Sequence, residues 1–261
     1  MKSTRDILEA MKSGDLSVEE AEEALRTLSL TAVGQIGMID LNREERNGIP
    51  EVVLAETKSI KNLIQIVQKI VSRKEFALLT RVQQAKLETL QQEMNEYHFD
   101  VSGDDDHLTV LVHDKKWSEP QKQGKIAIIT AGTSDVVYAE EAVAIARIMG
   151  VESLTLYDIG VAGIHRIIEP VMRIIEEKVD AVVVFAGMEG ALPTVLASLV
   201  DIPVIGVPVP VGYGYGGAGE TALASMLQSC APGLAVVNIG NGLGGGSVAC
   251  LIARNAAKKR D

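Results

Sequence analysis

Cysteine supplies the strongest nucleophile among the side chains of this protein, and the chain contains two. Cys250 lies in an apolar, alanine-rich stretch and is expected to be an inert buried thiol. Cys230 lies in the string Ser-Cys-Ala-Pro-Gly at residues 229–233, where a helix is expected to end. Covalent catalysis by Cys230 needs a nearby cation that stabilises the thiolate, and a structural role is the commoner one for a cysteine. Two cysteines cannot form a disulfide framework, which indicates a reducing compartment.

A histidine and an arginine stand side by side at the end of a glycine-containing loop over residues 158–166. The His165 imidazole can carry a proton near neutral pH, and the Arg166 guanidinium can anchor an anion. The alternative is an exposed pair without a chemical role, which is the more common situation for a single histidine. The pair is therefore a candidate for proton transfer next to an anionic substrate group.

Three polar residues, Thr133, Ser134 and Asp135, follow an expected strand and precede an expected helix. Backbone N–H groups at the start of that helix, together with the two hydroxyls, would suit a phosphate group. Ser134 or Asp135 can equally cap the helix without any ligand. Both interpretations are compatible with the spacing.

Two further loops follow expected strands. Glu189 is a lone carboxylate among Gly, Ala and Met at residues 187–191, which favours an acid–base or metal-binding role over a solvated one. Residues 207–219 form a long glycine-rich loop, in which Gly212 and Gly214 allow a ligand to approach the backbone closely. The alternative for this stretch is a mobile or interface loop.

A polar stretch over residues 41–50 is expected to be a loop between two short strands, at 35–40 and 51–56. Asp40, Arg43 and Arg46 lie in or beside it. Because guanidinium groups pair bidentately with phosphate, this group would suit an anionic substrate. A surface ion pair is the alternative.

The elements that must position these residues fall into two domains, residues 1–118 and 119–261, separated by the polar stretch 113–124. The first domain has a smaller α+β pattern after two amphipathic helices at residues 4–12 and 17–28. In the second, short apolar runs alternate with helical segments, which predicts a doubly wound α/β fold with a parallel sheet. Ligands of such sheets bind beyond the carboxyl ends of the strands. The expected strands span 125–130, 153–157, 181–185, 204–207 and 234–238, and the expected helices span 138–149, 164–178, 192–199, 221–228 and 247–258.

Composition excludes several classes of partner. The 261 residues carry a net charge of −10, and aromatic residues make up only 3%. An acidic chain with few aromatics is unsuited to nucleic acid or to an anionic membrane surface. The charged beginning of the sequence has no apolar signal segment, so a cytoplasmic protein is expected. Between residues 202 and 253 the only charged residue is Glu220, which predicts a subunit interface in a homo-oligomer.

These motifs together resemble the aminoimidazole ribonucleotide (AIR) carboxylases and mutases of the purine pathway. The longer strings at residues 158–166, 187–193, 211–214 and 229–233 resemble the LarB-type branch, which carboxylates a pyridinium ring in the synthesis of the nickel-pincer nucleotide of lactate racemase. Residues 40–51 resemble the N-terminal signature of that branch. The chain departs from the branch at Gly240, at Val209 with Pro210, and at Glu220.

The resemblance implies that nicotinic acid adenine dinucleotide is the substrate and that carbon dioxide or bicarbonate supplies the new carboxyl group. It implies Cys230 as nucleophile, His165 as proton carrier, Ser134 and Asp135 as substrate-binding residues, and Glu189 as a ligand of Mg²⁺. A homo-octamer is the assembly it favours. Two alternatives remain: the purine carboxylase or mutase reaction, and a nucleotide-binding regulatory module without catalysis.

Overall fold

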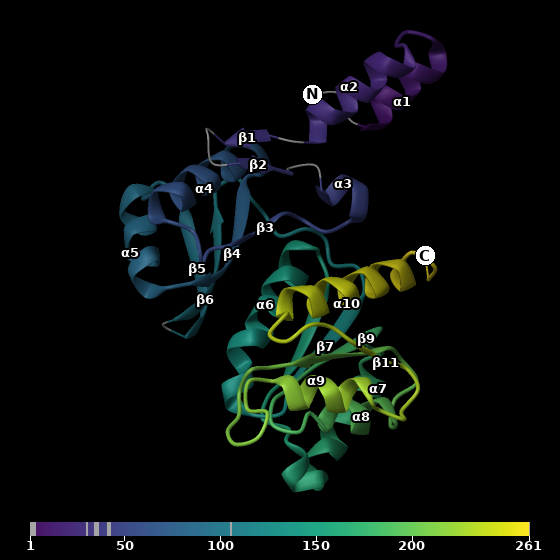
Figure 1. Cartoon of the computed structure of the whole chain (residues 1–261). Coiled ribbons are helices and arrows are strands. Elements are labelled where there is room, and N and C mark those ends of the chain that lie inside the picture. Colours follow the sequence, from purple (N-terminus) through teal and green to yellow (C-terminus); the bar gives the residue numbers. More distant parts are fainter. Residues whose placement is uncertain (1–3, 30, 34–36, 41–42, 105, 261) are drawn as a thin grey trace. The chain divides into compact units, whose positions relative to one another are not determined.

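The structure is a computed structural model, and it describes residues 4–29, 31–33, 37–40, 43–104 and 106–260. The chain divides into two compact units, described one at a time below (Figure 1). The first unit comprises residues 1–100 and 110–117, and the second comprises residues 101–109 and 118–261. The second unit holds the loops on which most of the candidate residues lie.

The first unit begins with two helices, α1 (Thr4–Ser13) and α2 (Val18–Ser29). The expected boundary between them is correct, because Ser17 and Glu20 form a reciprocal capping pair in which each backbone N–H donates to the other side chain. Strands β1 (Thr31–Val33) and β2 (Gly37–Ile39) then pair antiparallel. The first part of the strand expected over residues 35–40 lies outside the described residues.

A four-stranded sheet follows, with the strand order β3-β4-β6-β5. Two elements differ from expectation. The stretch 41–50, expected to be a loop, contains the short helix α3 (Arg43–Asn47). Strand β5 (His98–Asp104) was not expected, because most of its residues are exposed and the sequence there lacks an apolar alternation. The other elements are α4 (Ile60–Lys74), α5 (Gln84–Glu93), β3 (Val52–Leu54), β4 (Phe76–Val82) and β6 (His107–His113).

The second unit is built on a five-stranded parallel sheet with the order β11-β10-β9-β7-β8, which confirms the predicted fold class. Its central strands are apolar throughout because helices cover both faces, and every residue of β9 and β10 is buried. The strands are β7 (Lys125–Thr130), β8 (Glu152–Leu156), β9 (Ala181–Ala186), β10 (Val204–Pro208) and β11 (Leu234–Val236).

Helices connect these strands by crossovers, so each strand points in the same direction and all carboxyl ends meet at one edge. Residues of α7, α8 and α9 share one hydrophobic core with the sheet, and α10 packs beside α6 (Figure 1). The helices are α6 (Val136–Ile148), α7 (Ile168–Glu176), α8 (Leu192–Ala197), α9 (Glu220–Leu227) and α10 (Gly242–Ala257).

Helix α10 begins five residues before its expected start at residue 247. The Asn241 side chain caps it by accepting a hydrogen bond from the Gly244 N–H over 2.8 Å. The buried Glu141 carboxylate accepts another from the Leu243 N–H over 3.1 Å. A side chain at Gly246 would stand against Ala142 of α6, so glycine here serves close helix packing rather than a loop. Burial of α10 and β10 within the unit accounts for part of the charge-free stretch 202–253.

Among the described residues, no helix combines the length and the apolar character that a membrane span requires.

Candidate active site

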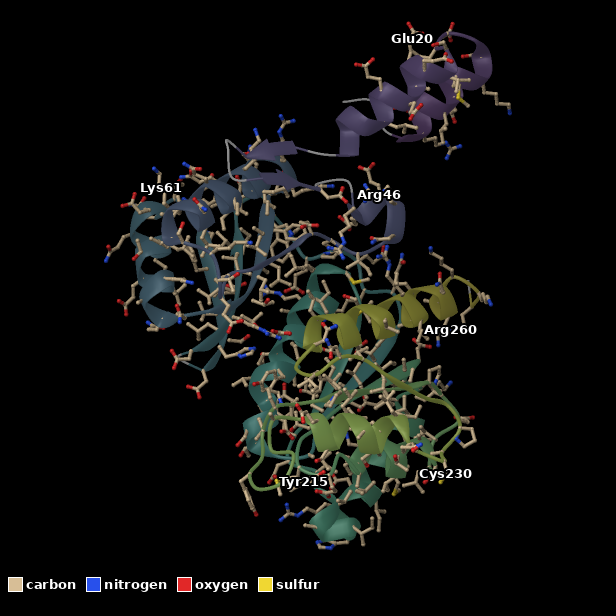
Figure 2. All side chains as sticks on the ribbon, viewed as in Figure 1. Glu20, Arg46, Lys61, Tyr215, Cys230 and Arg260 are labelled. Carbon is tan, nitrogen blue, oxygen red and sulfur yellow. The ribbon has the colours of Figure 1, made fainter. Side chains whose placement is uncertain are left out.

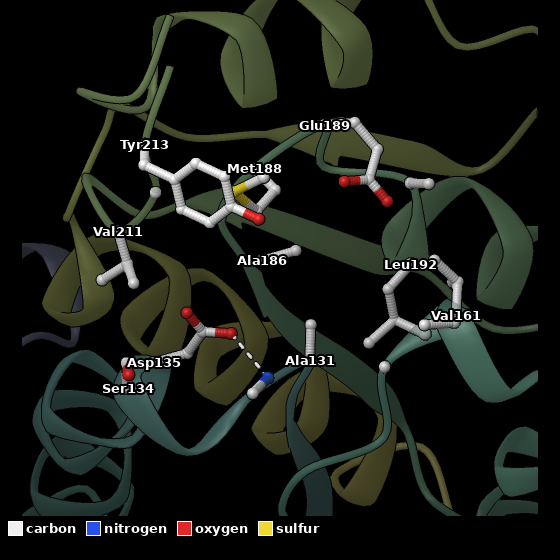
Figure 3. Close-up of a pocket in the computed structure, with 16 residues that line it drawn as sticks. Ala131, Ser134, Asp135, Val161, Ala186, Met188, Glu189, Leu192, Val211 and Tyr213 are labelled. Carbon is white, nitrogen blue, oxygen red and sulfur yellow. Dashed lines mark hydrogen bonds between the residues drawn. The ribbon is translucent and has the colours of Figure 1, made fainter. Parts of the chain in front are cut away.

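Four loops at the carboxyl edge of the parallel sheet enclose a pocket of about 510 Å³. They follow β7, β8, β9 and β10, which is the position expected for a ligand site in such a sheet. Figure 3 shows the pocket with Asp135 and Glu189 on opposite walls and the Tyr213 ring beside Met188. Its lining residues are Ala131, Gly132, Ser134, Asp135, Gly160, Val161, Ala162, Ala186, Gly187, Met188, Glu189, Ala191, Leu192, Val211, Gly212 and Tyr213.

The loop after β7 contributes a buried carboxyl group. Residues Thr133–Asp135 form one turn of 3₁₀ helix, and Asp135 is only 4% exposed. Its carboxylate accepts a hydrogen bond from the Gly132 N–H over 2.8 Å. Burial raises the pKa of Asp135 to about 6, although hydrogen bonds from the backbone of Gly132 and Ala131 oppose the shift. Asp135 can therefore exchange a proton close to neutral pH. Ser134 and Thr133 are both exposed, but only Ser134 belongs to the described lining of the pocket.

The loop after β8 carries His165 and Arg166 in the 3₁₀ segment Val161–Ile167. Both side chains are exposed, and they do not belong to the described lining of the pocket, which takes Gly160, Val161 and Ala162 from this loop. The Arg166 guanidinium lies 3.7 Å from the Asp158 carboxylate. The structure therefore places this pair one turn beyond the pocket residues of the same segment.

The loop after β9 is held tightly against the loop after β10. The Met188 N–H donates to the Val211 carbonyl oxygen over 3.1 Å. A side chain at Gly187 would collide with that same oxygen, so glycine is required for this close approach. Met188 has a φ of 50°, a left-handed conformation that is uncommon for a residue with a side chain. The neighbouring Glu189 is exposed and lines the pocket.

The loop after β10 brings Gly212 and Tyr213 to the pocket. Gly214, the next residue, has a φ of 72°, which explains the glycine there. Gly212 lines the pocket, whereas Gly214 is outside the described lining, and the ligand-binding role of both glycines stays a prediction.

The charged groups in the described lining of the pocket are all acidic. Its described lining includes two carboxyl groups, Asp135 and Glu189, and no Lys, Arg or His side chain. It also includes the Tyr213 ring and the Met188 thioether, both of which make favourable contacts with flat or cationic groups. Such a lining favours a positively charged, planar group over an anion.

Glu189 was expected to bind a metal ion. Across the described residues, no three His, Cys, Asp or Glu side chains gather as a set of metal ligands. One exposed carboxylate still fits Mg²⁺, which commonly binds through one or two carboxylates together with substrate phosphates and water. The metal-binding role of Glu189 stays a prediction.

Cys230 lies at the opposite edge of the sheet from this pocket within one chain. It is exposed, and it precedes β11, so it lies beside the amino ends of the strands. The Val204 N–H at the start of β10 donates to Gly233 over 3.1 Å, which fixes the 229–233 loop there. Figure 2 shows Cys230 and Tyr215 beyond opposite ends of α9. The sequence also leads us to expect His165, Glu189 and Cys230 around one cleft, completed where needed by a neighbouring subunit. A single chain does not bring the three together, because a helix C-terminus in this fold lies at the amino edge.

The arginines of the first unit are engaged in ion pairs. Arg46 makes a two-pronged pair with the Asp40 carboxylate, and Arg43 lies 3.3 Å from the Glu51 carboxylate. Arg46 is on the surface. The hydrogen bond from its guanidinium to the Asp40 carboxylate is the main cause of the raised pKa of Arg46. The three residues form one polar cluster around α3.

Sequence reasoning assigned no role to Tyr213 or Met188, although both line the pocket. The aromatic residue inside a glycine-rich loop was visible as a signal, because glycines leave a large side chain room to stand over a cavity. The burial of Asp135 had no such signal, since it depends on how the chain packs around the loop after β7.

The fold and the pocket define an α/β protein with a cavity at the carboxyl edge of its parallel sheet, the position at which such folds bind small molecules. Residues 125–260 match the AIR carboxylase family, and residues 31–104 match the LarB/PurE-like N-terminal domain. The chain thus belongs to the AIR carboxylase family, in its LarB-type branch, and this membership confirms the resemblance noted from the motifs. The family is a carboxylase and mutase class of enzymes.

Relatives with similar sequences agree with this membership. The chain is 44% identical over 256 residues to an uncharacterized protein of Methanocaldococcus jannaschii, covering 97% of this chain and 98% of the relative. It is 39% identical over 116 residues to the N5-carboxyaminoimidazole ribonucleotide mutase of that organism, covering 44% of this chain and 68% of the mutase. Among solved structures, PurE of Treponema denticola is similar, with 18% identity and a TM-score of 0.40 over 52% of this chain and 82% of PurE.

Proposed function

We propose that the protein carboxylates the pyridinium ring of nicotinic acid adenine dinucleotide and hydrolyses the phosphoanhydride, releasing AMP and pyridinium-3,5-biscarboxylic acid mononucleotide. The observation that carries this proposal is the lining of the pocket, in which two carboxyl groups and an aromatic ring occur without a cationic side chain among the described residues. A pyridinium ring brings the positive charge that such a lining lacks. A phosphorylated imidazole substrate brings no such charge.

The ring must first be made nucleophilic, because a pyridinium is electron-poor and does not attack carbon dioxide. The Cys230 thiolate adds to ring carbon C4, and the resulting dihydropyridine is an enamine whose C5 is electron-rich. C5 then forms the new bond to carbon dioxide. A base removes the C5 proton, and the nitrogen lone pair expels the thiolate from C4, which restores the pyridinium.

Two side chains are candidates for the base. Asp135 lines the pocket and has a pKa raised to about 6, so its carboxylate can accept a proton and release it near neutral pH. His165 lies beyond the pocket in a single chain, and it remains the candidate indicated by the sequence. A primary kinetic isotope effect with substrate deuterated at C5 identifies the proton-transfer step. The base is the residue whose replacement, Asp135→Asn or His165→Gln, makes the rate of that step independent of pH.

The remaining residues serve substrate binding. Ser134 offers a hydroxyl to the ribose or the ring carboxylate, and Arg166, Arg43 and Arg46 are cations available for phosphate oxygens. Thr133 and the backbone at Gly212 and Gly214 are further contacts. Glu189 would hold Mg²⁺ together with the substrate phosphates, where the metal would stabilise charge during anhydride hydrolysis.

Covalent catalysis requires a second copy of the chain. Within one chain Cys230 is at the amino edge and the pocket is at the carboxyl edge, so we infer that Cys230 of one copy completes the pocket of another. The homo-oligomer, for which the family resemblance favours an octamer, would then be a requirement of the reaction.

The decisive experiment is mass spectrometry of the protein incubated with nicotinic acid adenine dinucleotide, ¹³C-bicarbonate and Mg²⁺. AMP and a mononucleotide carrying one ¹³C carboxyl group are expected. Parallel incubations contain AIR in place of the dinucleotide, or the Cys230→Ala protein. Turnover of AIR without any labelled mononucleotide would show that the purine reaction is the correct one.

A further inference from the structure

Two tyrosines, Tyr213 and Tyr215, lie two residues apart in the loop after β10, and they differ in their position relative to the pocket. The Tyr213 side chain lines the pocket although the residue is 81% exposed. Tyr215 is fully exposed and lies outside the described lining. Tyr213 is also the one aromatic residue among the described residues that line the pocket (Figure 3).

Contacts on both sides hold the backbone around Tyr213 and keep its side chain at the rim of the pocket. The Val211 carbonyl oxygen accepts the Met188 N–H over 3.1 Å, which ties the start of the loop to the loop after β9. On the other side, a Cβ at Gly217 would stand 3.1–3.2 Å from the Tyr213 backbone, so the two segments are in close contact. The Thr221 hydroxyl lies 3.4 Å from the Tyr215 carbonyl oxygen at the far end of the loop.

We propose that the Tyr213 ring is the stacking wall for the planar, cationic heteroaromatic ring of the substrate, and so sets the preference for a pyridinium. This inference rests on the proposed function. The faces of an aromatic ring are electron-rich and attract cations, and the Tyr213 side chain is exposed enough for a ligand to reach a ring face. Asp135 and Glu189 on the opposite walls place negative charge around the same ring.

A fluorescence experiment tests the stacking without requiring turnover. Trp117, the single tryptophan, is changed to Phe, which keeps an aromatic ring against Phe76 and His113. Tyr213→Trp and, as matched control, Tyr215→Trp are then introduced separately. The probe is the 1-methylnicotinamide cation, a pyridinium without phosphate, and uncharged nicotinamide is the charge control.

The Tyr213→Trp protein is expected to show saturable quenching by the cation and weaker quenching, by about tenfold, with nicotinamide. The Tyr215→Trp protein is expected to show only the linear quenching of a solvent-exposed indole. Linear quenching of equal slope in both proteins, with both folded by thermal unfolding, overturns the proposal.

Kinetics separate this inference from the proposed function. Tyr213→Leu is expected to raise KM for the dinucleotide about tenfold, whereas Tyr213→Phe stays within about threefold because its ring face remains. Tyr215→Leu serves as the unchanged control. If the natural protein carboxylates the dinucleotide and Tyr213→Leu has the same KM, the stacking role of Tyr213 is refuted and the proposed function stands. Saturable quenching in a protein that never carboxylates the dinucleotide would support the stacking and refute the function.

Discussion

The Val204 amide donates a hydrogen bond to the Gly233 carbonyl oxygen over 3.1 Å, and this contact fixes the Cys230 loop at the beginning of β10. The pocket loop begins where the same strand ends, after Pro208. The two features are therefore separated by the full length of one strand, roughly 13 Å at the usual rise per residue. Every expectation about Cys230 has to take this separation into account.

The two cysteines should respond differently to replacement by alanine. Cys250 is fully buried in α10, and burial raises the pKa of its thiol to about 12, so it is not a nucleophile at neutral pH. Cys250→Ala is expected to keep turnover and to lose about 1 kcal/mol of unfolding free energy through a small cavity. Cys230→Ala is expected to abolish ring carboxylation while dinucleotide binding persists. Mass spectrometry and calorimetry provide the two measurements, and carboxylation by Cys230→Ala would falsify covalent catalysis.

Mixing two inactive variants should restore activity if each pocket uses a cysteine from another copy. Cys230→Ala retains an intact pocket, and Asp135→Asn, which removes a candidate base of the ring carboxylation, retains an intact cysteine. After the two proteins are unfolded and refolded together, random association gives roughly a quarter of sites both intact groups. Carboxylation at about that fraction of the natural rate is expected. The control is a mixture of the two variants refolded separately. If the co-refolded mixture is as inactive as this control, the pocket does not use a cysteine from another copy.

Asp135 should make folding stability depend on pH. Its pKa is raised from 3.8 to about 6 in the folded protein, so the folded state holds a proton that the unfolded state has lost. The corresponding stability is present below about pH 4 and is lost as pH rises through about 6. Asp135→Asn removes the buried charge and is expected to be more stable than the natural protein above pH 6, by about 3 kcal/mol at most.

Thermal unfolding between pH 4 and pH 7.5 measures this difference. Glu189→Gln removes one negative charge from an exposed side chain of the same pocket and serves as the control for net charge. A stability difference that is constant over the whole pH range would mean that Asp135 is as well solvated in the folded chain as in the unfolded one.

The arginines around α3 provide a test of the first unit. If Arg43 and Arg46 bind phosphates of the substrate, Arg43→Gln and Arg46→Gln raise KM for the dinucleotide about tenfold, since each loses a charge-assisted hydrogen bond. Their effect on unfolding free energy should stay below about 1 kcal/mol, because both ion pairs are near the surface. Lys61→Gln, at an exposed position of α4, is the control. An unchanged KM in both variants would mean that the arginines around α3 form surface ion pairs and do not bind the substrate.

The sequence predicted the parallel sheet well because buried strands leave a local signature. The five apolar runs of the second unit each match a strand, and the three central strands are almost wholly buried because both faces of the sheet are covered there. The start of α10 was missed because its glycines resemble a loop, and their role appears only in contact with Ala142. The candidate site likewise has a part that the sequence predicts and a part that it does not. The positions of the loops follow from strand order, whereas the burial of Asp135 and the distance of Cys230 from the pocket depend on which edge of the sheet each loop reaches.

The position of Cys230 at the opposite edge of the sheet from the pocket has a consequence for how the protein would behave at different concentrations. Under the proposed arrangement the thiol of one copy serves the pocket of another, so dilution would separate the two and leave each pocket without its nucleophile. Specific activity would then rise with the abundance of the protein itself, and the cell could regulate the reaction through expression level alone.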